Sequence, residues 1–268
     1  MTPSPTDKVK LKTLYAYKVF VIVLRNLHLI KQKKYFFMRN RNSLHECFEE
    51  VMDDIVNFEL NLEPRTEINY QPLTAFENLL GCVKSLVKDH FTIQYGYTHI
   101  SESYDQSIDV TEIHEHADFQ MIRPFPNDVA VLKLASAIPF GGNAQPIVLP
   151  RQYESAPVNG VSTLVGWGYL VTDGQVSTTL QMVNLKIYIH EECEAAHPTV
   201  EWEYNLCSGV DEGWKGQCSG DSGGPLTADG KQVGIVSWSE KPCGKKGYPG
   251  IYTRVSSYVD WINGKISA

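Results

Sequence analysis

Short apolar runs separated by turn residues constrain most strongly what this chain can fold into after about residue 80. Gly, Pro, Asn or Asp stands near the ends of each run. This pattern predicts short antiparallel strands of a β-sandwich or a β-barrel. The expected strands are Phe91–Tyr97, Ile108–Ile113, Val129–Leu134, Ser162–Trp167, Leu180–Ile189, Gln232–Trp238 and Gly250–Val255, and Ser256–Ile266 is expected to form a terminal helix.

The stretch from Gln217 to Leu226, Gln-Cys-Ser-Gly-Asp-Ser-Gly-Gly-Pro-Leu, contains the parts of a nucleophilic site except its base. A serine hydroxyl attacks only when a base takes its proton and donors stabilise the oxyanion. The glycines around Ser222 permit a tight turn that points the amides of Gly220 and Ser222 at one spot. The alternative is a Gly/Ser/Pro-rich turn without catalysis, and we favour the nucleophile.

The run Gly-Asp-Ser-Gly-Gly-Pro in this stretch resembles the nucleophile motif of the trypsin and chymotrypsin family of serine proteases. Residues 127–134, Asn-Asp-Val-Ala-Val-Leu-Lys-Leu, resemble the family segment that carries the triad carboxylate, which implies that role for Asp128. Gly166-Trp167-Gly168 and residues 246–255 are also similar, the latter to mite digestive trypsins. The resemblance implies an all-β fold, a double antiparallel β-barrel with a C-terminal helix over residues 78–268, whose first barrel is incomplete or atypical.

The resemblance also implies a substrate pocket with unusual residues. Gly216 stands where a trypsin carries an aspartate, and Ser239 replaces a glycine of the pocket wall. A small or apolar side chain is therefore the expected guest, because the pocket has no anion at its base. The implied substrate-binding residues are Gly216, Gln217, Ser237, Trp238, Ser239 and Gly250.

The cysteines indicate an oxidising compartment. The resemblance implies disulfides between Cys193 and Cys207 and between Cys218 and Cys243. We therefore expect an extracellular, secreted protein, although the N-terminus is a weak leader sequence. Whether Cys47 pairs with Cys82 stays open.

The triad base is missing at its expected place. The family carries its histidine in Thr-Ala-Ala-His-Cys, whereas residues 78–82 here read Asn-Leu-Leu-Gly-Cys, so the position falls on Gly81. Glycine cannot transfer a proton. No spacing favours another histidine as a substitute, and His114 and His116 resemble a structural segment better than a metal site.

The activation sequence Ile-Val-Gly-Gly is also absent from the chain. In the family, its new α-amino group pairs with the aspartate before the serine, here Asp221. Without this partner, we expect the oxyanion hole to remain loose.

Residues 1–77 differ in composition from the rest and form a segment of unknown role. Residues 8–41 contain ten basic and no acidic residues, whereas residues 46–63 contain seven acidic and no basic ones. Apolar residues at three- and four-residue intervals predict an amphipathic helix within 46–63. Such an arm could hold a partner or a membrane surface, but a solvated extension is favoured.

Charge and composition narrow the partners. The net charge of −7 argues against a nucleic-acid partner, since phosphate binding needs a basic face. The apolar run Val19–Leu24 is too short to span a membrane. We expect no cofactor, no metal, and a monomer that binds a protein or peptide.

The combined pattern predicts a serine protease homologue that is catalytically inactive and acts by binding. Resemblance to inactive protease paralogues of parasitic mites implies other proteases or host defence proteins as ligands. The alternative is an active secreted serine endopeptidase whose first exons are misassembled ahead of Cys82. A third reading, in which residues 1–77 form a genuine interaction module, ranks last.

Overall fold

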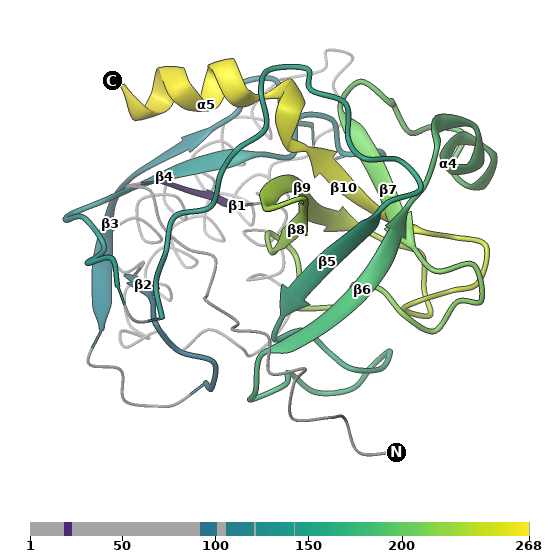
Figure 1. Cartoon of the computed structure of the whole chain (residues 1–268), viewed down its shortest axis with the longest axis horizontal. Helices are drawn as coiled ribbons and strands as arrows, with labels where there is room; N and C mark the ends of the chain where they lie inside the picture. The colour runs from purple at the N-terminus through teal and green to yellow at the C-terminus, as the bar shows by residue number, and fades with distance from the viewer. Residues whose placement is uncertain (1–18, 23–91, 101–105, 121, 142, 268) are drawn as a thin grey trace, which may run out of the picture.

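A computed structural model of the chain describes residues 19–22, 92–100, 106–120, 122–141 and 143–267. Gly81, Cys47, Cys82 and the helix expected within 46–63 lie outside these residues. The described part forms a four-stranded sheet beside a closed six-stranded barrel, with a helix at the C-terminus (Figure 1).

The closed barrel is built from the C-terminal half of the chain in the order β10-β7-β6-β5-β8-β9. Every pairing in it is antiparallel. Its strands are β5 (Val161–Gly166), β6 (Gln181–Ile187), β7 (Asn205–Gly209), β8 (Pro225–Ala228), β9 (Lys231–Trp238) and β10 (Gly250–Arg254). Leu164, Leu206, Leu226 and Tyr252 belong to its apolar core. Closure leaves the barrel no free sheet edge.

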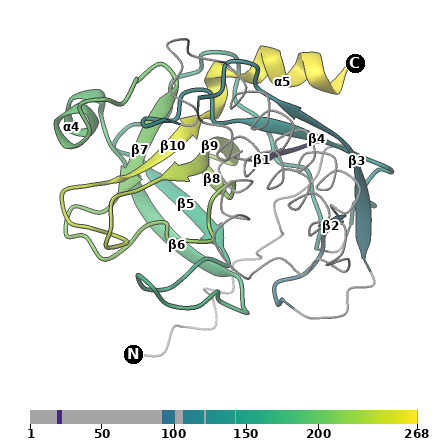
Figure 2. The same ribbon diagram turned by 180° about the vertical axis from the view of Figure 1, so that it is seen from behind.

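The second sheet has the order β1-β4-β3-β2 and is also antiparallel. Its strands are β1 (Val19–Ile22), β2 (Thr92–Gln94), β3 (Ser107–Glu115) and β4 (Ala130–Leu134). Figure 2 shows this sheet from behind, beside the barrel. Among the described residues it is an open sheet and not a closed barrel.

β4 is buried on both faces because its alternating residues belong to two cores. Leu132 and Leu134 pack with the sheet, whereas Val131 packs with Ile235 of β9 and Ile262 of α5 (Val259–Ile266). The core that contains Val131, Ile235 and Ile262 therefore joins the sheet, the barrel and the C-terminal helix. A short 3₁₀ turn, η2 (Val255–Ser257), leads into α5, which lies above the four-stranded sheet in Figure 1.

The fold class and all seven expected strands are confirmed, with ends shifted by a few residues. The expected terminal helix is present as α5, after η2. Strands β1, β7 and β8 and the helix α4 (His190–Ala196) are not among the expected elements. β1 lies within residues 1–77, yet it pairs with β4 through Val19 to Ile22.

Candidate functional site

Asp128 lies where the sheet, the barrel and the C-terminal helix meet. Its side chain is 1% exposed. The hydroxyl of Ser237 in β9 donates a hydrogen bond of 2.6 Å to its Oδ2, and Thr253 in β10 donates one of 2.9 Å to its backbone carbonyl. Tyr258 donates to the neighbouring Asn127 Oδ1 at 3.1 Å. A buried carboxylate needs such donors, so residues distant in sequence hold Asp128 in one orientation.

The serine loop is a sequence of tight turns between Cys218 and Gly224. Asp221 N–H donates to the Cys218 carbonyl at 3.1 Å, and Gly224 N–H donates to the Asp221 carbonyl at 2.8 Å. Gly220 has a φ of +94° and Gly223 a φ of +84°. L side chains rarely adopt such angles. The glycines flanking Ser222 are therefore required by the backbone.

Strand β9 fixes the loop that carries Ser222. Gly223 N–H donates to the Val236 carbonyl at 2.9 Å, and Val236 N–H donates back to Gly224 at the same distance. Ser237, the next residue of β9, bonds Asp128. One strand thus positions both the serine loop and the carboxylate.

Asp221 is held by backbone amides. Gly168 N–H donates to its Oδ1 at 2.8 Å, and Cys218 N–H donates to its Oδ2 at 2.9 Å. Among the described residues, no ammonium or guanidinium group pairs with it. Burial raises the pKa of Asp221 above its ordinary value, and the two amide bonds oppose this rise. The carboxyl group is therefore desolvated, and no described residue supplies a countercharge.

The Gly166-Trp167-Gly168 segment forms a cradle around this carboxyl group. A Cβ on Gly166 would lie 2.2 Å from Asp221 Oδ1, and a Cβ on Gly168 would lie 2.4 Å from its Cγ. Both glycines are needed for the close approach. Their role was not predicted, although two glycines around a tryptophan were visible in the sequence.

Four of the six expected substrate-binding residues line a common pocket, whereas Ser237 and Trp238 are not part of its lining. Gly216, Gln217, Ser239 and Gly250 surround a hollow of about 10 Å³. Gln217 is 2% exposed. The nearby residue Trp238 is 4% exposed, and its Nε1–H donates to the Pro124 carbonyl at 3.1 Å.

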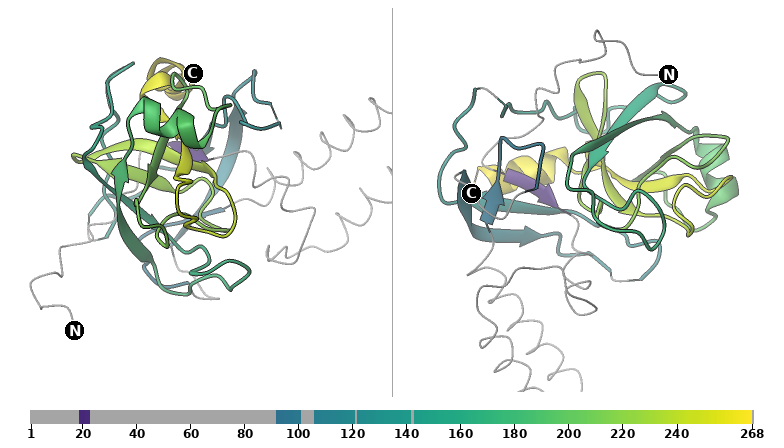
Figure 3. Two further views of the ribbon diagram at one scale, coloured as in Figure 1. Left: turned by 90° about the vertical axis from the view of Figure 1, so that its right-hand side faces the viewer. Right: turned by 90° about the horizontal axis from the view of Figure 1, so that it is seen from below.

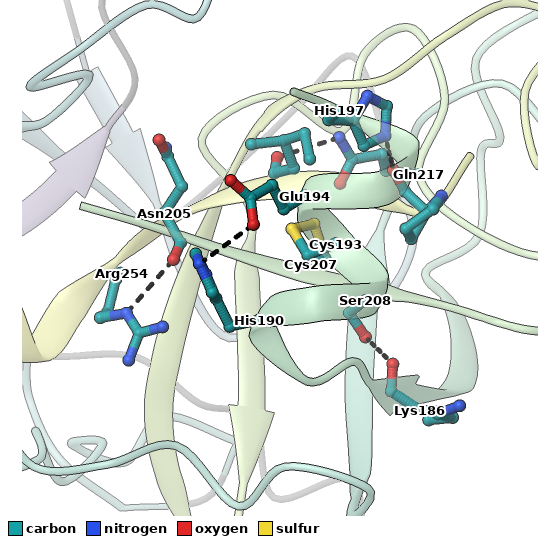
Figure 4. The surroundings of a disulfide bond; sticks show 12 residues. Lys186, His190, Cys193, Glu194, His197, Asn205, Cys207, Ser208, Gln217 and Arg254 are labelled. Atoms are coloured by element: carbon teal, nitrogen blue, oxygen red, sulfur yellow. Dashed lines mark hydrogen bonds and ion pairs between the residues drawn. A yellow bond between two sulfur atoms is a disulfide. The ribbon is translucent and has the colours of Figure 1, made fainter. Parts of the chain in front are cut away.

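Two disulfides brace this region. Cys218–Cys243 joins the serine loop to the segment before β10, and Cys193–Cys207 joins α4 to β7. Figure 4 shows the second bond, with His190 facing Glu194 on α4. Both pairs are those implied by the family resemblance.

The base position, Gly81, lies outside the described residues, and the described histidines make other contacts. His116 packs against Tyr258 and Trp261. His197 Nε2 is 2.9 Å from the Pro249 carbonyl. His99, His114 and His190 lie against Thr179, Glu112 and Glu194 respectively.

The part of the chain that the structure describes contains no cluster of three metal-binding side chains. No described helix has the length and apolar character needed to cross a membrane.

Comparisons with known proteins identify the family. A model of the trypsin family matches residues 81–262. Trypsin-1 of Astacus astacus is 39% identical over 170 residues, covering 61% of this chain and 69% of its own length. Trypsin II-P29 of Gallus gallus is 42% identical over 144 residues, covering 53% of this chain and 56% of its own length.

A solved structure agrees with these sequence matches. Neuropsin, described as a serine protease expressed in the limbic system of mouse brain, superposes with a TM-score of 0.61 at 28% identity. The superposition covers 68% of this chain and 82% of neuropsin. The serine loop, the buried aspartate, the closed barrel and these matches together show that the chain belongs to the trypsin family of serine proteases.

Proposed function

We propose that this trypsin-family member binds protein or peptide segments and does not hydrolyse them. Ser222 and Asp128 would supply the nucleophile and the triad carboxylate, and Gly220 an oxyanion donor. The residue at the histidine position is Gly81, which has no side chain to carry a proton. This substitution carries the proposal, since the triad reaction needs a base that accepts the serine proton and returns it to the leaving group.

The surroundings of Asp221 support the same proposal. The family activates when an α-amino group pairs with this aspartate, and the chain has no Ile-Val-Gly-Gly sequence to provide one. Asp221 instead accepts hydrogen bonds from two amides, and its pKa is raised by burial. A desolvated carboxyl group that has no countercharge among the described residues fits a protein that has not gone through this activation step.

The proposed ligands are proteins or peptides, with other proteases or host defence proteins as the expected class. We propose that the ligand backbone lies along Ser237 and Trp238 of β9, where the trypsin family holds a substrate backbone. The two disulfides favour an extracellular location. We propose a monomer.

A second candidate function is secreted serine endopeptidase activity. The abrupt change in composition before Cys82 favours it, because a replaced block at the N-terminus would remove the histidine without altering the serine loop. The curated relatives match from about half to two thirds of their own length. The activity of these relatives is therefore proposed for this chain only within this second candidate function.

A fluorophosphonate probe distinguishes the two functions because it labels a serine that has an active base. Under the proposal, wild type and Ser222→Ala remain equally unlabelled. Stoichiometric labelling of wild type, lost in Ser222→Ala, would overturn it. Peptide mapping of the native protein adds an independent result: peptides from residues 1–77 support the proposal, whereas a peptide starting Ile-Val-Gly-Gly in their place supports the endopeptidase.

A further inference from the structure

Gln217 crosses the pocket that would receive a ligand side chain. Its Nε2 donates to the Trp238 carbonyl at 2.6 Å and to the Ile251 carbonyl at 3.3 Å. Trp238 ends β9 and Ile251 lies near the start of β10. The amide group therefore bridges the two strands that form the pocket wall, with both N–H groups occupied.

The oxygen at the other end of the same amide has no partner in the part of the chain that the structure describes. Gln217 Oε1 is buried and accepts no hydrogen bond from the described residues. It lies 2.9 Å from the place that a Cβ on Gly250 would occupy, so only glycine at position 250 leaves room for it. A buried carbonyl oxygen without a donor is unfavourable, and a donor entering the pocket would relieve this cost.

The space left beside Gln217 is small. The hollow of about 10 Å³ is close to the room that one water molecule needs. Gly216 adds no side chain to its lining.

We infer that Gln217 fills the specificity pocket from within and restricts the entering ligand side chain to a small one, with serine preferred because its hydroxyl can donate to Gln217 Oε1. This inference rests on the proposed binding function and deepens it. The lack of an anion at Gly216 explains only why a basic side chain is not attracted. Gln217 explains why a large apolar one is excluded as well.

The inference is tested by titration calorimetry with a Kunitz-type protease inhibitor whose pocket-entering residue is Ser, Ala, Leu or Phe. The full chain is compared with Gln217→Ala, which opens the pocket, and Gln217→Glu, which keeps its size. We expect wild type to bind the Ser inhibitor about fivefold more tightly than the Ala inhibitor, from one hydrogen bond of typical strength. The Leu and Phe inhibitors should bind at least about tenfold more weakly than Ala.

In Gln217→Ala, the Leu and Phe inhibitors should gain at least about tenfold in affinity, and the advantage of Ser over Ala should vanish. Gln217→Glu should still exclude Leu and Phe. An unchanged order in Gln217→Ala, tight binding of Phe by wild type, or no binding of any inhibitor would overturn the inference. Unfolding curves verify that the variants fold. If Gln217→Ala does not fold, Gln217→Ser takes its place, because it also opens the pocket and keeps a hydroxyl.

This test is independent of catalysis because the affinities are measured without turnover. Cleavage of a peptide substrate would overturn the proposed lack of hydrolysis but would leave the order of inhibitors unchanged. The reverse result, no cleavage with Phe bound best, would overturn only the role of Gln217.

Discussion

Gly168→Ala tests whether close packing against Asp221 holds the serine loop in place. The new Cβ would lie 2.4 Å from Asp221 Cγ and 2.5 Å from its Oδ2, closer than atoms can approach. Overpacking of this kind costs about 1–3 kcal/mol. Movement of the carboxylate would also weaken the 2.8 Å bond from Gly168 N–H, at about 1.5–3 kcal/mol for a charged partner.

We therefore expect Gly168→Ala to lower the free energy of unfolding by about 2.5–6 kcal/mol, and the melting temperature by about 5–24 °C. Guanidinium unfolding followed by tryptophan fluorescence measures the first, and calorimetry the second. Gly264→Ala is the matched control, because a Cβ there meets no atom within 4 Å and the residue lies in α5. It should stabilise the protein by about 0.5–1 kcal/mol. A Gly168→Ala protein within about 1 kcal/mol of wild type would refute the reasoning.

Three further predictions concern the residues around the site. Ser237→Ala removes the donor at 2.6 Å from Asp128 and should lower the free energy of unfolding, measured with a chemical denaturant, by about 1.5–3 kcal/mol. The control Ser155→Ala changes an exposed residue and should alter this free energy by less than about 0.5 kcal/mol. Equal effects of the two substitutions would contradict the role of Ser237. Because burial raises the pKa of Asp221 in the folded state, its contribution to stability is lost as pH rises from about 4. The free energy of unfolding of Asp221→Asn should therefore rise relative to that of wild type as pH increases. The opposite trend would contradict the claim that Asp221 is desolvated. Replacing Cys193 and Cys207 by alanine opens a loop with a sequence separation of 14 and should lower the free energy of unfolding by about 3 kcal/mol, a conclusion that fails if the double variant melts like wild type.

The strands could be predicted where apolar residues alternate or run together between turn residues, as at Val129–Leu134 and Gln232–Trp238. β7 and β8 were missed for identifiable reasons. β7, Asn-Leu-Cys-Ser-Gly, is buried at all five positions, so it has no exposed face to produce alternation. β8 has only four residues, which is too short for a clear alternation of apolar and polar residues.

The site was predictable where a local motif carries it, and not where its parts come from different strands. The Ser222 loop and Asp128 are visible in contiguous sequence. The donors Thr253 and Tyr258 belong to β10 and the C-terminal segment, and only folding brings them to residues 127 and 128. Figure 3 shows the C-terminal helix, in yellow, beside the strands of the four-stranded sheet, which come from much earlier in the chain. The position of the Gln217 amide depends on the carbonyls of two strands, so its sequence neighbours do not reveal it.

Hydrolysis by the native chain tests the central claim most directly. Wild type and Ser222→Ala are incubated with a mixture of unstructured peptides that presents all side chains, and new termini are identified by mass spectrometry. Loss of the triad base should lower the rate by about 10⁶-fold relative to a complete triad, so we predict the same peptides after incubation with either protein. Cleavage by wild type that disappears in Ser222→Ala would show a working catalytic serine and contradict the account.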